Sequence, residues 1–144
     1  MMNVVLYMDK MDEEGRRLLT AVKASPSSPE PELHLSIGGL RHRLRCLVPY
    51  SCVLILKTST QEALLRILEL GGFLRDHRTI LVLPDRDKST LSLAHTLYPR
   101  YATFQDSDFH EIPGVLNRML GSEHAVENTP RTEIARCLPD GQTG

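Results

Sequence analysis

A lysine lies at the position where an open parallel sheet usually has its ligand-binding or reacting groups. Lys57 directly follows the apolar run 52–56, whereas Asp9 and Asp12 follow the first apolar run and Asp85 follows a later one. Ligands and reacting groups of such sheets lie at the carboxyl ends of the strands. We therefore expect these four side chains to surround one pocket, with an ion pair from Lys57 to Asp9 or to Asp12.

A second interpretation of Lys57 is an anion site. Thr58 and two further hydroxyl residues precede a predicted helix, and hydroxyls together with helix N-terminal amides favour phosphate. The simpler interpretation is a lysine that is ion-paired or that extends its ammonium to water, and we favour it. Asp85 and the alternating charges after it could rim the pocket, but they also fit a solvated loop and helix cap.

Metal binding and catalysis have little support in the sequence. Asp106, Asp108 and His110 alternate oxygen and nitrogen ligands, but Asp108 is also expected to cap the last helix. The chain has no nucleophile elbow, no phosphate-binding glycine–lysine loop and no dinucleotide glycine motif. We predict no metal site, no cofactor and no enzymatic activity.

Composition narrows the class of protein and its compartment. The chain has 144 residues, 41% hydrophobic residues and a formal charge of −1, which suits one globular domain with no global attraction to nucleic acid or anionic membrane. Cys46, Cys52 and Cys137 are an odd number, and His42 with Cys46 lacks the second pair that a zinc site needs. We expect reduced thiols in the cytoplasm, no membrane span and no signal peptide.

The elements that must position these residues alternate strand with helix. Apolar runs and alternation predict five strands, at 3–8, 33–37, 52–56, 79–83 and 101–104. Helical spacing predicts five helices. The first starts within 9–14, and the others cover 38–48, 60–70, 89–98 and 109–120. The segment 38–48 also fits a hairpin. Ser59–Glu62 and Asp108–Glu111 have the pattern of capping boxes. We expect an α/β domain over 1–121, with a mostly parallel sheet covered on both faces, and a flexible tail over 122–144.

This alternation, with acidic residues after the first strand, resembles the response-regulator receiver domain of the CheY-like superfamily. The resemblance implies a three-layer α/β/α sandwich with the flavodoxin-like strand order 2-1-3-4-5. It also implies that Asp9 and Asp12 correspond to the acidic pair that helps to hold magnesium. Lys57 stands in place of the phosphoacceptor aspartate, Pro84–Asp85 in place of a small hydroxyl residue, and Gln105–Asp106 in place of a lysine. The degenerate pocket would comprise Asp9, Asp12, Lys57, Thr58, Asp85 and Gln105.

The resemblance implies a bacterial-type signal-transduction module that works by protein–protein interaction, independent of phosphorylation. A protein partner or a second copy would bind the face of the fourth helix, fifth strand and fifth helix, which would include Leu93, Leu97, Phe104, Val115 and Met119. The alternative is a small-molecule or nucleotide-binding flavodoxin-like domain with its pocket at the strand ends.

A dense basic run lies outside that pocket. Arg41, Arg43 and Arg45 alternate with His42 and Leu44, in the segment predicted as the second helix. These arginines could contact an acidic partner or a nucleic-acid backbone, but nucleic acid is the less expected of the two because the whole chain is not basic. A solvated helix face is the simpler interpretation of the run, and we favour it.

Overall fold

The computed structural model describes residues 3–25, 29–47, 52–75 and 77–128, and the side chains of these residues as far as Leu120. Five parallel strands form one sheet of order β2-β1-β3-β4-β5, as the resemblance implies. Along each strand, alternate side chains point to opposite faces. Lys57 pairs with Met8 of β1 and with Val82 of β4. The strands are β1 (Asn3–Met8), β2 (Glu32–His34), β3 (Cys52–Lys57), β4 (Arg78–Leu83) and β5 (Tyr101–Phe104).

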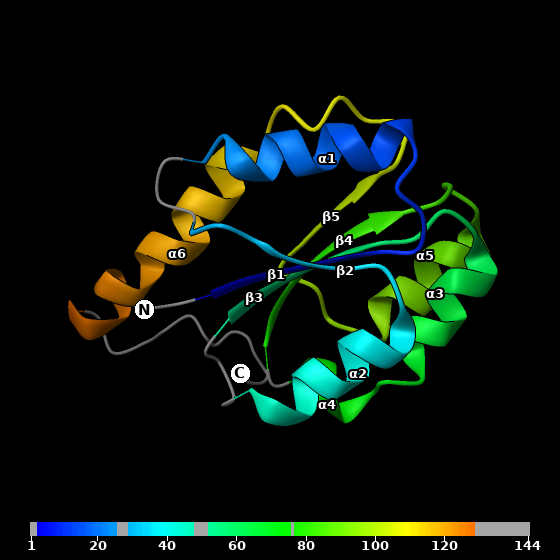
Figure 1. Cartoon of the computed structure of the whole chain (residues 1–144), viewed down its shortest axis with the longest axis horizontal. Coiled ribbons are helices and arrows are strands. Elements are labelled where there is room, and N and C mark those ends of the chain that lie inside the picture. The colour runs from blue at the N-terminus through cyan, green and yellow to red at the C-terminus, as the bar shows by residue number, and fades with distance from the viewer. Residues whose placement is uncertain (1–2, 26–28, 48–51, 76, 129–144) are drawn as a thin grey trace.

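Helices cover both faces of the sheet, so the predicted three-layer α/β/α sandwich is confirmed (Figure 1). One core cluster joins α1 (Glu13–Lys23) and α6 (Ile112–Asn128) to side chains such as Ile55 and Val82. The other face packs against the remaining helices through side chains such as Leu54 and Leu81. These helices are α2 (Ile37–Cys46), α3 (Gln61–Leu68), α4 (Gly72–Arg75) and α5 (Lys88–His95).

Helix starts account for several differences from the predicted boundaries. The segment that also fitted a hairpin is helix α2, and its cap is Ser36, whose hydroxyl accepts from the Gly39 amide at 3.1 Å. The second strand therefore ends at His34 and not at residue 37. The cap of α3 is Thr60, which accepts from the Ala63 amide at 3.1 Å. Ser59, which was expected to open the capping box, does not cap α3. Its side chain can therefore form hydrogen bonds at the carboxyl ends of the strands.

The last helix begins later than predicted, and Asp108 does not cap it. Phe109 adopts a φ of 60°, a left-handed conformation that interrupts the helix before Ile112. The Asp108 carboxylate accepts from the His110 amide at 3.1 Å, which closes a local turn. The helix α6 then continues to Asn128, past the predicted end at Leu120 and into the segment predicted as a tail. Residues 129–144 of that segment lie outside the described residues.

Candidate functional site

Lys57 is the centre of the site at the carboxyl ends of the strands. It is the last residue of β3, and its side chain is fully buried, with 0% exposed. It has the same parity as Val53 and Ile55, which belong to the core cluster beneath α1 and α6. Its ammonium therefore lies on that side of the sheet, where β1 gives way to α1.

Two side chains contact the ammonium directly. Lys57 Nζ lies 3.4 Å from Asp12 Oδ1 and donates to Ser59 Oγ at 3.1 Å. Ser59 in turn donates twice to Asp9, from its hydroxyl at 2.9 Å and from its amide at 3.0 Å. The predicted Lys57–Asp12 ion pair is confirmed, while Asp9 is linked to Lys57 through Ser59. We call Asp9, Asp12, Lys57 and Ser59 the lysine network.

Asp12 has two structural roles in this network. It caps α1 by accepting from the Gly15 amide at 2.9 Å, and it carries the counter-charge of Lys57. Desolvation by burial raises the pKa of Asp12, but the Gly15 amide and the Lys57 ammonium outweigh it, so the pKa lies below its ordinary value of 3.8. Asp12 is thus a carboxylate at neutral pH. Because a buried charge without a partner is costly, Asp12 is needed by the core as well as by the helix.

The other residues of the predicted pocket hold neighbouring strand ends together. Thr58 is buried, and both its amide and its hydroxyl donate to the Val82 carbonyl, at 3.0 and 3.3 Å. Gln105 Nε2 donates to the carbonyls of Pro84 at 3.0 Å and Ser59 at 3.3 Å. Asp85 accepts from the Thr90 hydroxyl at 2.6 Å, so it stabilises the start of α5. The hydrogen bonds of these side chains hold together the segments that follow β3, β4 and β5.

An open pocket of about 540 Å³ lies over these strand ends. It brings together Asp12, Asp85 and Gln105 of the predicted set, whereas Lys57, Asp9 and Thr58 do not line it. Four carboxylates against one guanidinium make its wall unfavourable to phosphate, and Lys57 is covered. The geometry therefore disfavours the anion interpretation of Lys57. The complete lining is Asp12, Glu14, Ser59, Pro84, Asp85, Arg86, Gln105 and Asp106.

Sequence reasoning missed Glu14 as a pocket residue, named Arg86 only among the alternating charges that could rim the pocket, and assigned Asp106 to a candidate metal group. Arg86 donates to Asp106 at 2.7 Å, and its guanidinium carbon lies 4.1 Å from the centroid of the Phe104 ring. The alternating charges after β4 were the signal for Arg86, but a partner on the loop after β5 cannot be assigned from spacing. Glu14 carries no motif, and it faces the pocket because α1 begins beside β1.

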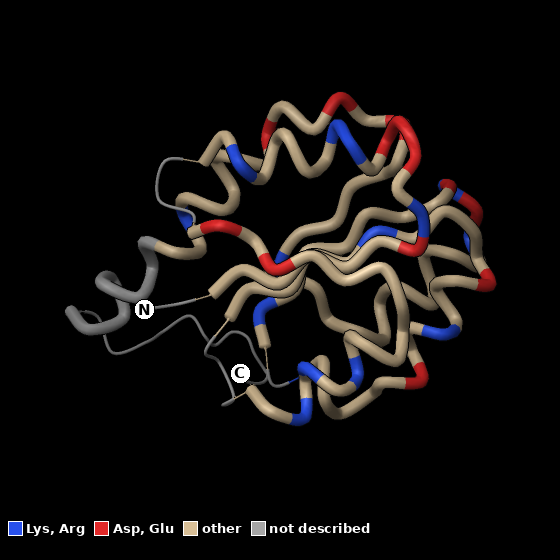
Figure 2. The backbone as a smooth tube through the Cα atoms, viewed as in Figure 1, with Lys and Arg blue, Asp and Glu red and all other residues tan. Residues whose placement is uncertain are grey.

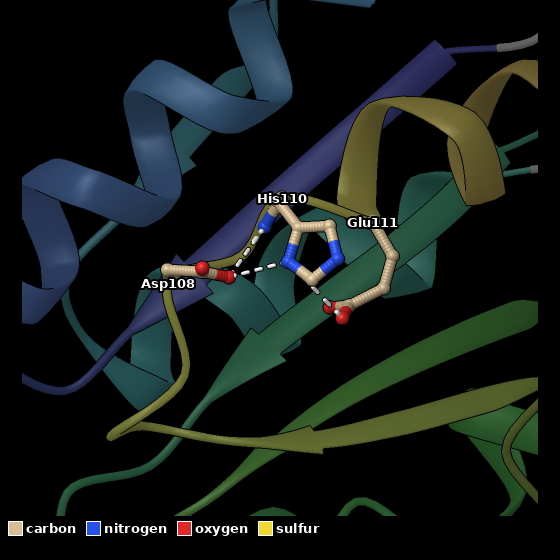
Figure 3. A group of neighbouring side chains, drawn as sticks. All are labelled: Asp108, His110 and Glu111. Atoms are coloured by element: carbon tan, nitrogen blue, oxygen red, sulfur yellow. Dashed lines mark hydrogen bonds and ion pairs between the residues drawn. The ribbon is translucent and has the colours of Figure 1, made fainter.

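The structure does not bring together Asp106, Asp108 and His110, the candidate metal ligands that the sequence analysis considered and did not favour. Asp106 pairs with Arg86, whereas Asp108 and His110 lie beside Glu111, with one ligand atom of each within 4.8 Å of the others (Figure 3). His110 Nδ1 lies 2.6 Å from Asp108 and 3.5 Å from Glu111. The hydrogen bond with Asp108 raises the pKa of His110 and lowers that of Asp108. An exposed histidine–carboxylate ion pair accounts for this group.

The residues considered for a zinc site, Cys52, Cys46 and His42, lie in different environments. Cys52 is buried, with its sulfur 3.6 Å from His77 Nδ1, and burial raises the pKa of its thiol to about 12. A thiol with this pKa stays protonated at neutral pH and is a poor metal ligand. Cys46 and His42 are exposed on α2 instead.

The five apolar residues predicted as an interaction surface do not form one surface. Val115 and Met119 are buried beneath α6 in one core cluster. Leu97 is buried in the cluster on the opposite face of the sheet, where Leu93 and Phe104 are partly buried. This correction arises because periodicity marks the apolar face of a helix without showing whether the core already covers it.

Comparison with known proteins does not assign the chain to a family. No protein-family model matches it, and neither does any of the curated proteins with which it was compared. Among the described residues, no helix combines the length and the apolar character needed to cross a membrane.

Proposed function

We propose that this chain is a receiver-like regulatory domain that acts by binding a protein partner and accepts no phosphoryl group. The observation that carries the proposal is the buried ammonium of Lys57, held by Asp12 and Ser59 at the strand ends. In the receiver resemblance this position belongs to the phosphoacceptor aspartate. An ammonium can neither accept a phosphoryl group in that role nor leave room for the cation that such chemistry needs.

The contacts of the lysine network support the loss of magnesium. Mg²⁺ requires oxygen ligands at close to octahedral geometry. Asp12 already has Lys57 and the Gly15 amide as partners, and Asp9 already accepts twice from Ser59. A fixed positive charge between these carboxylates would also repel a divalent cation. The lysine thus supplies internally the positive charge that a bound metal would supply.

Crosslinks at the strand ends support a domain held in one state. Gln105 bonds to the backbone after β3 and after β4, and Thr58 bonds twice to Val82 of β4. A ligand can shift a conformational equilibrium only through different affinities for the two states. A domain whose strand ends are held in one arrangement would present one surface constantly and would signal by its presence or abundance.

Acetyl phosphate tests the loss of phosphoryl chemistry. The full chain is incubated with Mg²⁺ and acetyl phosphate, and its intact mass is measured; in parallel, its Tm is measured with Mg²⁺ and beryllofluoride. We expect an unchanged mass and an unchanged Tm, because no residue at the strand ends can take the acceptor role. A phosphoryl adduct that disappears when Asp9 or Asp12 is replaced by Asn would refute the proposal.

The second candidate is a small-molecule domain, and the open pocket of about 540 Å³ is the observation in its favour. Its excess of carboxylates favours a cationic ligand over a nucleotide. Nucleotides and cyclic dinucleotides should therefore leave the Tm unchanged. A saturable rise in Tm with one of them would promote this candidate, because a ligand that binds only the folded state stabilises it.

Self-association through the face of α5, β5 and α6 is part of the first proposal. Among the described strands, β5 pairs with β4 alone and is an edge of the sheet, and Leu91 on α5 and Tyr98 in the loop before β5 are exposed. Light scattering over a range of protein concentrations should show a mass that rises toward that of a dimer. A constant monomer mass at high concentration would leave a different protein as the partner.

A further inference from the structure

Helices α2 and α4 together carry a basic surface that the lysine network does not use. Arg41 and Arg45 lie one helical turn apart on α2 and are exposed, whereas Leu40 and Leu44 on the same helix are buried. Arg75 is exposed on α4, which contacts α2. Neither helix contains an acidic residue. Figure 2 shows blue segments and no red ones on these two helices.

Arg41, Arg45 and Arg75 have no carboxylate partner among the described residues, in contrast to Arg43, Arg66 and Arg86. Arg43, on the same helix, makes a bidentate contact with Glu32, with hydrogen bonds of 2.8 to 3.0 Å. For Arg41, Arg45 and Arg75, no ion pair forms with any described residue. Guanidinium groups bind carboxylates and phosphates through paired donors, so an uncompensated group of them favours an anionic partner.

The short helix that carries Arg75 also carries an exposed aromatic residue. Phe73, on α4, keeps 39% of its surface exposed, although its neighbour Leu74 is fully packed in the core. Aromatic and arginine side chains together are typical of the anchoring residues of protein interfaces. We call Arg41, Arg45, Phe73 and Arg75 the basic face.

We propose that the basic face binds an acidic segment of a partner protein, with an apolar side chain of that segment against Phe73. Nucleic acid fits less well, because three guanidinium groups neutralise few phosphates and the salt-dependent affinity scales with that number. The chain also has a net charge of −1, which gives no attraction at longer range. A carboxylate-rich peptide needs only a few paired contacts and an apolar anchor, and the basic face offers both.

Fluorescence anisotropy with a labelled glutamate–tyrosine copolymer tests this inference on the full chain. We expect saturable binding that weakens when NaCl is raised from about 50 to about 200 mM, since exposed charges are screened by salt. The triple variant R41E/R45E/R75E should bind at least about tenfold more weakly, which corresponds to about 1.4 kcal/mol. Phe73→Ala should weaken binding about threefold without changing its salt dependence.

A matched control separates the basic face from net charge. R16E/R100E/R118E makes the same change of charge at exposed arginines on α1, before β5 and on α6. This control should change binding by less than about twofold at the higher salt, where long-range effects are screened. If R41E/R45E/R75E does not fold by circular dichroism, R41Q/R45Q/R75Q replaces it with the same expected direction.

Two outcomes would overturn the inference. One is equal loss of copolymer binding in the two triple variants, or no binding by the wild type. The other is tighter binding of a labelled DNA duplex, or of phosphatidylserine vesicles, through the same arginines. Neither outcome bears on the lysine network, whose tests use acetyl phosphate and Mg²⁺.

Discussion

Lys57 depends on Asp12 more than Asp12 depends on Lys57, because only the lysine side chain is fully enclosed. The ammonium is entirely buried, with Asp12 and Ser59 as its polar contacts, whereas Asp12 keeps 35% of its side chain exposed. Water can therefore hydrate the carboxylate if the lysine is removed, but it cannot hydrate the ammonium if the carboxylate is removed. Replacing Asp12 should cost more stability than replacing Lys57 with the apolar Met.

Asp12→Asn and Asp12→Ala separate the ion pair from the helix cap. Asn retains capping ability but not the charge, so Asp12→Asn should lower the free energy of unfolding by about 2 kcal/mol, less than for a fully buried pair. Asp12→Ala should lower it by about 1 kcal/mol more, because the Gly15 amide also loses its acceptor. Urea denaturation measures both values. Wild-type stability of Asp12→Asn would show that Lys57 does not need this charge.

The lowered pKa of Asp12 also predicts a pH dependence. A carboxyl whose pKa is lower in the folded than in the unfolded chain stabilises the fold above the unfolded value, here 3.8, and that stabilisation is lost as the pH falls further. The difference in stability between wild type and Asp12→Asn should thus be constant above about pH 5 and should shrink below about pH 4. Urea denaturation across this range measures the difference. A difference that grows as the pH falls would contradict the assigned direction.

At the scale of elements, two turns require a left-handed backbone conformation, which a tyrosine adopts in one and a glycine in the other. Tyr98, after α5, has a φ of 50° and is 77% exposed, and Gly71, before α4, has a φ of 43°. A left-handed conformation costs a residue with a side chain about 1 kcal/mol or more, and glycine much less. The exposed Tyr98 therefore makes few contacts that would offset its strain.

Tyr98→Gly should raise the free energy of unfolding by about 0.5 kcal/mol, because released strain slightly exceeds the added entropy of the unfolded chain. Gly71→Ala should lower it by about 1 kcal/mol, although the nearest atom to an added Cβ is 3.9 Å away, so the cost is conformational. Thermal unfolding of both variants checks the pair of signs. Destabilisation by Tyr98→Gly would show that the ring makes a contact that outweighs the strain.

The strands and their order could be predicted because buried parallel strands have continuous apolar runs, as in 52–56, and because alternation with helices restricts the topology. Boundaries depended on chemistry that the sequence leaves ambiguous. Thr60 and Ser59 are equally good caps, and only the position of Asp9 beside β3 assigns Ser59 to the lysine network. The left-handed Phe109 had no signal in the sequence, since an aromatic residue is an unusual choice there.

The position of the site could be predicted because the strands and their order could be predicted. Its individual side-chain contacts could not. Parallel strands place Asp9, Asp12, Lys57 and Asp85 at one edge of the sheet whatever the loops do. The choice of Asp12 over Asp9 as the partner of Lys57 follows from the cap of α1, which sequence spacing does not fix in space. Loop-to-loop contacts such as that of Arg86 with Asp106 have no local pattern at all.

At the scale of the whole molecule, charge is divided between two ends of the sheet. Carboxylates surround the pocket at the carboxyl ends of the strands, whereas uncompensated arginines lie on α2 and α4. The formal charge of −1 is therefore compatible with two surfaces of opposite charge. Together the two proposals imply that partners of different charge would bind at separate places, and that the lysine network would keep Mg²⁺ from the acidic end.

A Mg²⁺ titration of the Tm tests the central claim, with wild type and Lys57→Asp measured in parallel and NaCl used to match the ionic strength. Lys57→Asp puts three carboxylates at the strand ends, which is a ligand set suited to Mg²⁺. The account predicts that Mg²⁺ raises the Tm of Lys57→Asp in a saturable way and leaves that of the wild type unchanged. A saturable rise in the wild type that Asp12→Asn abolishes would contradict it, because the ammonium would then not be holding the place of the cation.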